Sequence, residues 1–363
     1  MALDPKDVGE LQRALNDAAG KASILWTSFV IFQLYLAIAF GSVTHRDLFL
    51  ETSLKLPVLN VDLALVGFFV VAPTLLVIFH FYIFLQLLGL AFKARDYNTL
   101  LMREARVASD RQYLRQRLDV FPILQLLAGP RDQRTGFRGF SLRLMAWITL
   151  VGSPVLILLQ GQVTFLPYHL EWVVWLHRVA VLIDIAVIWY FWIHLRTEDV
   201  PIPISRVSSK IWKIVGGVVT LCVLTFSIYL ATFPGEWMKT NLPGWSLQTL
   251  LFEGRVDPLS GRPTSLFSNR LVLSNQSFDP DKLEKIGVTR SFRGRDLRSA
   301  VLNLIDLRKA DFTGAHLQGA FLGYAQLEGT SFRYADLQGA DLNGAQLQGA
   351  SFWYARLQGA YLY

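Results

Sequence analysis

Polar and apolar positions follow two different patterns along this chain, and the change lies near residue 290. From residue 292 to the end of the sequence, an apolar residue occupies every fifth position. These repeat centres are Phe292, Leu297, Leu302, Leu307, Phe312, Leu317, Leu322, Leu327, Phe332, Leu337, Leu342, Leu347, Phe352, Leu357 and Leu362. From residue 310 an alanine stands two positions before each centre, with Thr330 as the exception. Neither an α-helix, which repeats about every 3.6 residues, nor a strand, which repeats about every 2, has this period.

A period of five residues indicates a chain that turns corners regularly, as solenoid proteins do. Phe292, Phe312, Phe332 and Phe352 lie 20 residues apart, with three leucines between each pair. Four units therefore complete one coil, in which the centres and the alanines point inward. Glycine often stands two positions after a centre, where the absence of a Cβ permits a corner. We expect Phe332 to lie between Phe312 and Phe352 of the adjacent coils.

These units resemble the pentapeptide repeat, whose pattern is Ala, Asp or Asn, Leu or Phe, and two variable residues. The tripeptides at 335–337 and 340–342 both read Ala-Asp-Leu and match it fully. The resemblance covers residues 290–363 and implies a right-handed quadrilateral β-helix. The first units depart from the pattern, because Arg290, Arg295 and Ile305 stand where a small residue belongs. We therefore expect the first coil to be distorted or covered by preceding residues.

The residues before the repeats contain five long apolar runs, at 22–40, 63–92, 144–159, 172–195 and 211–233. Each is near or above the ~20 residues that a helix needs to cross a bilayer core of ~30 Å. The composition agrees, with 52% apolar residues and a mean hydropathy of +0.35. These runs predict an α-helical transmembrane domain of about five spans at residues 22–233. The second run is longer than required, so its helix tilts, continues beyond the membrane or bends at Pro73.

Basic residues are distributed unevenly among the segments between the runs. Residues 93–143 contain 11 Lys and Arg, whereas residues 161–171 contain none. Because positive segments stay in the cytoplasm, this pattern places 93–143 and the N-terminal segment 1–21 there. Five spans then place the repeats outside the cytoplasm. The whole chain resembles bacterial membrane-bound pentapeptide-repeat proteins, and we expect a multi-pass protein of the bacterial inner membrane.

Three further segments carry weaker signals. Residues 1–21 resemble a short amphipathic helix or a frayed terminus. Residues 118–127 could form a helix at the membrane interface, so that the basic segment binds anionic lipid head groups, although topology alone explains its charge. Residues 234–289 are rich in turn residues and form a connector, with "RLVL" at 270–273 as a strand and a helix that covers the first coil.

Few ionisable residues lie within the apolar runs. A charge there costs at least ~2.5 to 3.5 kcal/mol, so Asp184 in the fourth run should have a partner. His80 of the second run is the best candidate, because His177 lies two helical turns away from Asp184 on the same helix. Arg178 should reach the outer surface. The pair is either part of a proton or ion path or, as we favour, a structural contact between helices.

The sequence has none of the common enzyme signatures, including HExxH, GxxxxGK, GxSxG and CxxC. We expect no catalytic residue, no cofactor and no metal site. The favoured function is a membrane-anchored scaffold that uses its repeats for protein–protein contact. The alternative is a transporter or channel that uses polar residues around Asp184.

The predicted partners follow from the two domains. They are membrane lipids and either another protein or a second copy bound through the repeats. Nucleic acid or its mimicry is not expected, because the repeats mix acidic and basic residues. Tyr361, Leu362 and Tyr363 in the last repeat should contact a partner or second copy, or else fold over the end of the stack.

Overall fold

The computed structural model describes residues 5–55, 62–105, 107–195, 209–241, 246–254, 265–276 and 291–363. The chain forms two compact units. Unit 1 contains Met1–Ile38, Pro73–Leu158 and Ala180–Leu221, and unit 2 contains Ala39–Ala72, Leu159–Val179 and Cys222–Tyr363. The boundaries fall within helices, so the long helices contribute residues to both units.

Helices dominate the chain before the repeats. They are α1 (Pro5–Ser42), α2 (His45–Leu50), α3 (Leu65–Glu104), α4 (Ala108–Gln116), α5 (Pro122–Ala128), α6 (Arg131–Arg134), α7 (Gly136–Trp147), α8 (Ser153–Phe165), α9 (Glu171–Leu195), α10 (Ser209–Leu224), α11 (Trp237–Asn241) and α12 (Ser246–Leu251). Two π-helical segments occur, η1 (Ile148–Gly152) and η3 (Thr225–Leu230), and η2 (Leu166–Tyr168) is a 3₁₀-helix. The short strands β1 (Leu54–Lys55) and β2 (Asp62–Leu63) pair antiparallel.

Five helices in the described part of the chain are long and apolar enough to cross a membrane. They are Val8–Ser42, Leu65–Glu104, Gly136–Tyr168, Glu171–Phe191 and Lys213–Leu230. Helix α1 runs without a break from Pro5, so the N-terminal segment and the first apolar run form one helix. Helix α3 continues through Pro73 to Glu104, which shows that the second run extends as a longer helix.

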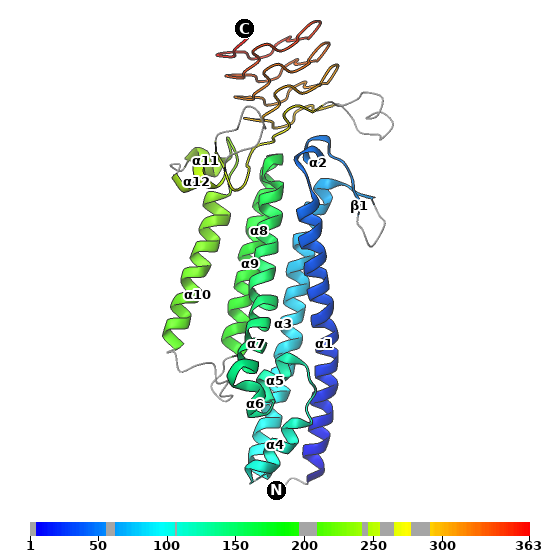
Figure 1. The fold of residues 1–363 in the computed structure, drawn as a ribbon, viewed down its shortest axis with the longest axis vertical. Helices are drawn as coiled ribbons and strands as arrows, with labels where there is room; N and C mark the ends of the chain where they lie inside the picture. Colours follow the sequence, from blue (N-terminus) through cyan, green and yellow to red (C-terminus); the bar gives the residue numbers. More distant parts are fainter. Residues whose placement is uncertain are drawn as a thin grey trace. The chain divides into compact units, whose positions relative to one another are not determined.

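In unit 1, α1, α3 and α9 lie side by side (Figure 1). Aromatic rings join them: Phe29 and Phe79 have centroids 5.2 Å apart, and Phe84 stacks on Phe191 at 5.1 Å. Helix α5 overlaps the segment 118–127, for which a helix at the membrane interface was predicted. Helix α5 buries Leu124, and the preceding Phe121 is buried with its ring 6.1 Å from Trp26. These apolar side chains therefore pack against protein rather than lipid.

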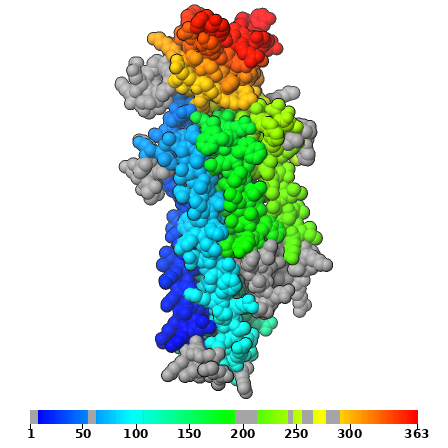
Figure 2. Space-filling model, turned by 180° about the vertical axis from the view of Figure 1, so that it is seen from behind, coloured from blue at the N-terminus to red at the C-terminus, as the bar shows by residue number. Residues whose placement is uncertain are grey.

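In unit 2, the repeats form a four-sided coil. Parallel bridges join residues 20 apart, such as Ser291 with Asp311, Asp311 with Ser331, and Ser331 with Ser351. Backbone bonds connect successive coils, as where the Phe312 N–H donates to the Ser331 carbonyl at 2.8 Å. Figure 2 shows these coils, in orange and red, packed without a visible hollow on the face in view. The predicted coil of four units is confirmed.

The interior of the stack contains the predicted centres. The rings of Phe292, Phe312, Phe332 and Phe352 form one column, with successive centroids 4.9, 5.3 and 5.1 Å apart. The centres from Phe292 to Leu342 are buried. The four later centres belong to the last coil, where Leu347, Phe352 and Leu357 are half-buried and Leu362 is exposed.

Each corner of the stack uses a left-handed backbone conformation. The residue two positions after the centre has φ between 56° and 71° in every unit from 292 to 357. Glycine occupies eight of these corners. The other six are Ser299, Leu304, Lys309, Tyr324, Tyr334 and Tyr354, whose Cβ atoms make this conformation unfavourable by roughly 1 kcal/mol or more each.

Candidate functional site

The first candidate site is a buried pair in unit 1. His80 of α3 and Asp184 of α9 are both fully buried, and Nδ1 of His80 lies 2.6 Å from Oδ1 of Asp184. Nε2 of His80 lies 3.0 Å from the Leu150 carbonyl oxygen in η1. The imidazole stacks on Phe29 at 5.2 Å and contacts Phe84 at 4.6 Å. The structure thus brings together the two residues that the sequence paired.

The hydrogen bonds of His80 restrict where protons can be. The Leu150 carbonyl only accepts, so Nε2 must donate its proton to that oxygen. The 2.6 Å contact then requires a proton between Nδ1 and Oδ1. Whichever of the two atoms carries that proton, the pair has no net charge. A neutral pair is far less costly in an apolar interior than an isolated carboxylate.

The π-helical segment η1 explains why backbone carbonyl groups near His80 are free to accept hydrogen bonds from side chains. A π-helical turn changes the backbone hydrogen-bond register, and carbonyls in such turns can bind side chains. The Leu150 carbonyl accepts from His80, and the Thr149 carbonyl accepts from Gln33 Nε2 of α1 at 3.0 Å. Side chains from α1 and α3 are thus fixed to η1, which indicates a structural contact between helices.

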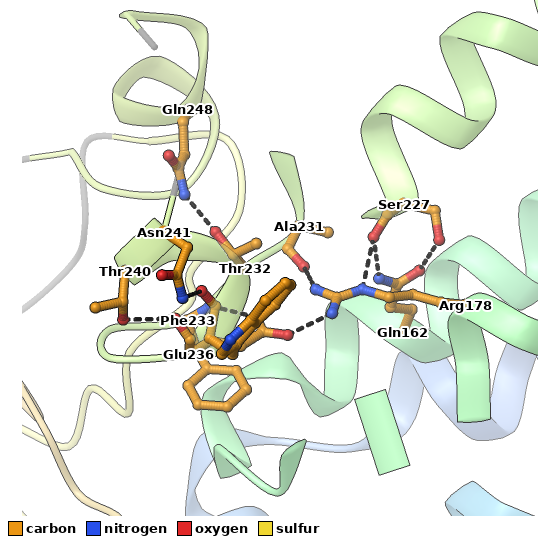
Figure 3. A network of polar contacts seen from close by, with 11 residues as sticks. Gln162, Arg178, Ser227, Ala231, Thr232, Phe233, Glu236, Thr240, Asn241 and Gln248 are labelled. Carbon is orange, nitrogen blue, oxygen red and sulfur yellow. Dashed lines mark hydrogen bonds and ion pairs between the residues drawn. The ribbon is translucent and has the colours of Figure 1, made fainter. Parts of the chain in front are cut away.

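A second buried cluster lies in unit 2 and corrects one prediction. Arg178 was expected to reach the outer surface, but the structure buries it and pairs its Nη1 with Oε1 of Glu236 (Figure 3). Its Nη2 donates to the Ala231 carbonyl at 3.0 Å, and its Nε donates to the Ser227 carbonyl at 3.2 Å. Because nearby carbonyls and a carboxylate satisfy the guanidinium, it does not need to reach water.

The network continues on both sides of this ion pair. Ser227 in η3 receives a bond from Gln162 Nε2 at its carbonyl and donates its hydroxyl to Gln162 Oε1, both at 2.7 Å. Oε2 of Glu236 accepts from the Phe233 N–H at 3.2 Å (Figure 3). Burial raises the pKa of Glu236, although the hydrogen bond and charge of Arg178 act in the opposite direction.

A third arrangement in unit 2 covers the first coil of the repeats. Phe49 of α2 stacks on Phe292 with centroids 4.3 Å apart, and so extends the phenylalanine column by one ring. Leu273 is buried, and its N–H donates to the Val301 carbonyl at 2.8 Å. The expected cover is therefore present, and the "RLVL" segment, predicted only as a strand, joins the stack through a bridge between Val272 and Val301. The connector contains the short helices α11 and α12, and its residues 277–289 together with Arg290 lie outside the described residues.

Arg295 is the residue that fixes α2 to this coil. Its two terminal nitrogens donate to the Leu48 and Phe49 carbonyls, each at 3.2 Å, at the end of α2. Nη1 also lies 2.8 Å from Oε1 of Glu51, and the guanidinium covers the Tyr168 ring at 4.4 Å. The departure of Arg295 from the repeat pattern thus has a physical cause, because a small residue could not make these contacts. We call these contacts of Arg295, together with the Phe49–Phe292 stacking, the stack joint.

Asp296, the next residue, adds a half-buried charge beside the stack joint. Its carboxylate pairs with Arg298, with Oδ1 2.9 Å from Nε, and lies 3.5 Å from Nδ1 of His169. Burial alone would raise the pKa of Asp296, but Arg298 and His169 together hold it well below the usual range. The carboxylate therefore stays ionised in the folded stack.

The surface of the last two coils carries an exposed cluster. The Tyr334 and Tyr354 rings stack at 5.3 Å with an interplanar angle of 8°, and the Arg333 guanidinium covers the Trp353 ring at 4.8 Å. All three aromatic side chains are more than half exposed. Tyr361, Leu362 and Tyr363, the predicted contact residues of the last repeat, are also exposed.

The described residues show little that suggests chemistry on a small molecule. No group of three or more His, Cys, Asp or Glu among them could hold a metal ion. An apolar pocket of about 180 Å³ in unit 1 is lined by Trp147, Val151, Ile188, Trp189, Lys213, Val215, Gly216, Val219 and Thr220. It contains neither His80 nor Asp184.

Solved structures similar to this chain cover only part of it. A pentapeptide repeat protein from the Arabidopsis thaliana thylakoid lumen is 35% identical over 20% of this chain and 46% of its own, with a TM-score of 0.15. One from the cyanobacterium Cyanothece 51142 is 28% identical over 20% and 53%, with a TM-score of 0.14. One from Nostoc Pcc 7120 is 36% identical over 24% and 78%, with a TM-score of 0.15. The chain thus spans about half the length of the first two.

A family match covers the repeats. No curated protein matches the chain. The family model described as "Pentapeptide repeats" matches residues 291–323 and 325–362 in eight copies. The C-terminal region is therefore a pentapeptide-repeat region.

Proposed function

We propose that this protein is a membrane-anchored scaffold that presents its pentapeptide-repeat stack for contact with other proteins. The five apolar helices supply the anchor. The observation that carries the proposal is the stack joint, in which the first coil is held through the Phe49–Phe292 stacking, three polar contacts of Arg295 and one cation–π contact of Arg295 with Tyr168. In unit 2 the stack is thus built directly onto helix ends.

The attachment of the stack to α2 matters for binding because association with a partner reduces conformational freedom. A stack on a flexible tether would lose that freedom when a partner binds, whereas a stack already held in place loses less. The stack also consists of rigid coils, whose surface is defined before any partner arrives. Both properties suit a platform for protein contact.

The proposed location is the bacterial inner membrane, with the N-terminus in the cytoplasm and the repeats outside it. The support is the basic segment 93–143 together with five candidate spans. A reporter fused after Tyr363 should be active outside the cytoplasm, and one inserted at Gln112 should be active inside. Cytoplasmic activity at both sites would rule out the five-span arrangement.

The alternative function, transport along polar residues around Asp184, has the His80–Asp184 pair in its favour. The pair is enclosed by Phe29 and Phe84 and bonded to Leu150, which suits a static contact better than a path. We therefore retain the scaffold as the proposed function.

Photocrosslinking from the four sides of the stack tests the scaffold proposal. The photoreactive residue p-benzoylphenylalanine would replace Tyr324, Gln348, Tyr354 or Gln358, one at a time, in the full chain in native membranes. These exposed positions lie on four different sides of the coil. A scaffold should give a protein adduct from at least one side, whereas adducts with lipid alone, or none, would exclude this function.

A further inference from the structure

Arg333 differs from every other arginine of the stack in what its guanidinium contacts. Residues 291–363 contain six arginines. Five of them pair with a carboxylate: Arg293 with Asp311, Arg295 with Glu51, Arg298 with Asp296, Arg308 with Asp306, and Arg356 with Asp336. Among the described residues Arg333 has no carboxylate partner, and it lies over the exposed Trp353 ring instead.

Tyr334 and Tyr354 adopt a backbone conformation that is less favourable for them than for the glycine found at most other corners. Both occupy left-handed corners, with φ of 58° and 56°, where glycine stands in most other units. A tyrosine there strains the backbone, and its exposed ring gains little from burial. The two corners lie in successive coils, so the strained residues stand directly above one another with their rings stacked. Backbone strain at an exposed, ordered pair of aromatic residues points to a role outside the stability of the stack.

We propose that Arg333, Tyr334, Trp353 and Tyr354 form a docking surface for an acidic segment of a partner protein, and we call these four residues the aromatic patch. Tyr, Trp and Arg are the residues that contribute most to protein interfaces. The planar guanidinium of Arg333, already oriented by Trp353, can bind a carboxylate of the partner with two parallel hydrogen bonds. The flat rings beside it accommodate an apolar or aromatic neighbour of that carboxylate.

Charge favours an acidic segment of a separate protein, because four of the six acidic residues at 291–363 already pair with arginines of the stack. The acidic residues that bond or pair within the stack include Asp296, Asp306, Asp311 and Asp336. A partner that supplies its own carboxylate avoids breaking one of these pairs. A lipid surface is a poorer fit, because the aromatic patch offers one unpaired cation beside neutral rings.

The inference rests on the proposed scaffold function, and one experiment separates the two. The photocrosslinker at position 354 should capture a protein, and mass spectrometry of the adduct should place the crosslink beside Asp or Glu. The crosslinker at position 324 is the matched control, because Tyr324 is also an exposed tyrosine at a left-handed corner, on the opposite side of the coil.

Substitutions near the crosslinker then test the chemistry. Arg333→Gln should reduce the adduct at position 354 by about fivefold or more, as expected for a central interface residue. Arg333→Lys keeps the charge but not the planar fork, so it should restore only part of the yield. Arg308→Gln, on another side of the coil, should leave the adduct unchanged.

Tyr334→Gly gives an independent measure. Glycine relieves the left-handed strain, so the variant should resist proteolysis at least as well as the wild type while losing most of the adduct at position 354. Loss of both properties would mean that the tyrosine serves the stack itself and would overturn the proposal.

The remaining outcomes distinguish failure of the aromatic patch from failure of the scaffold proposal. Adducts of equal yield from 324 and 354, or an adduct at 354 that Arg333→Gln leaves unchanged, would refute the aromatic patch but leave the scaffold intact. An adduct at 354 with a lipid or with a second copy of this chain would also refute it. Failure to capture protein from any side of the coil would remove the scaffold as well.

Discussion

The repeat stack and the helices bury their interiors in opposite ways. Every side of the stack repeats the same kind of residue at intervals of 20, so Phe292, Phe312 and Phe332 occupy equivalent places and need no partner beyond their neighbours. The helices instead bury ionisable residues that each require one particular partner, as Asp184 requires His80 and Arg178 requires Glu236. Stability in the stack is therefore distributed along the chain, whereas in the helices it is concentrated at a few contacts.

Both buried pairs in the helices lie beside π-helical turns. The Leu150 carbonyl in η1 accepts from His80, and the Ser227 carbonyl in η3 accepts from Arg178 and Gln162. A π-helical turn is less stable than an α-helical one, but it supplies carbonyls to buried donors. The two pairs still differ, since Arg178 cannot lose its proton and needs the Glu236 carboxylate as a counter-charge, whereas His80 and Asp184 can both be neutral. The comparison therefore predicts unequal responses to mutation.

The largest effect is expected for Arg178→Ala. Removing the guanidinium leaves Glu236 buried without its partner, which should lower the free energy of unfolding by about 3 to 5 kcal/mol. Thermal unfolding of the purified protein in detergent measures it. The double variant Arg178→Ala with Glu236→Gln should recover part of the loss, because no unpaired charge remains. A double variant no more stable than Arg178→Ala would show that packing, not charge, dominates.

The second effect concerns the interior of the stack. Phe332→Ala opens a cavity between Phe312 and Phe352 and should cost about 3 to 5 kcal/mol, towards the lower end if adjacent coils relax into it. Protease resistance of the repeat region reports the change. Gln348→Lys, at an exposed position of the stack, serves as the control and should be nearly neutral. Equal resistance in the two variants would contradict the inward position of Phe332.

The third effect concerns the stack joint. Arg295→Ala removes charge-assisted bonds to the Leu48 and Phe49 carbonyls and should cost about 1.5 to 3 kcal/mol. Arg308→Ala is the matched control, because the Arg308 side chain is 46% exposed where it pairs with Asp306, and pairs made by a surface cation contribute about 0 to 1 kcal/mol. Hydrogen exchange at α2 should rise in the first variant only. Unchanged exchange at α2 would mean that ring stacking alone holds the joint.

The smallest effect is expected for Asp184→Asn. The amide can donate to Nδ1 of His80 while Nε2 still donates to Leu150, so the change in stability should stay within about 1 kcal/mol. Asp184→Leu cannot make this bond and should cost more. Thermal unfolding compares the two. If Asp184→Asn abolished a proton or ion flux in reconstituted vesicles while folding survived, the transport alternative would replace the scaffold.

Two parts of the structure could be predicted from the sequence because a repeated type of residue specifies them. The five-residue period exists because each unit stacks on the one 20 positions away, so the pattern is visible without tertiary knowledge. Apolar runs identify the candidate spans in the same way. Asp184 could be paired with His80 because few other polar side chains in the runs can offer a proton.

Contacts that depend on the meeting of distant segments were not predictable. Glu236 lies in a turn after the fifth run, and nothing in its neighbourhood indicates that Arg178 will reach it. The role of α2 depends on Phe49 meeting Phe292, which are more than 240 residues apart in the sequence. Arg295 did give a signal, because it breaks the repeat pattern, but the pattern does not reveal what it binds.

The 20-residue coil also governs how this protein can change in length. A duplication of one whole coil would lengthen the stack and leave every later residue on its original side. An insertion of a single pentapeptide would instead rotate all later units by a quarter turn about the axis of the stack. Inserted before Arg333, it would carry Trp353 and Tyr354 to the neighbouring side and would also interrupt the column of phenylalanine rings in the interior. The residues of the outer surface therefore stay on their original sides only if the stack gains length in whole coils.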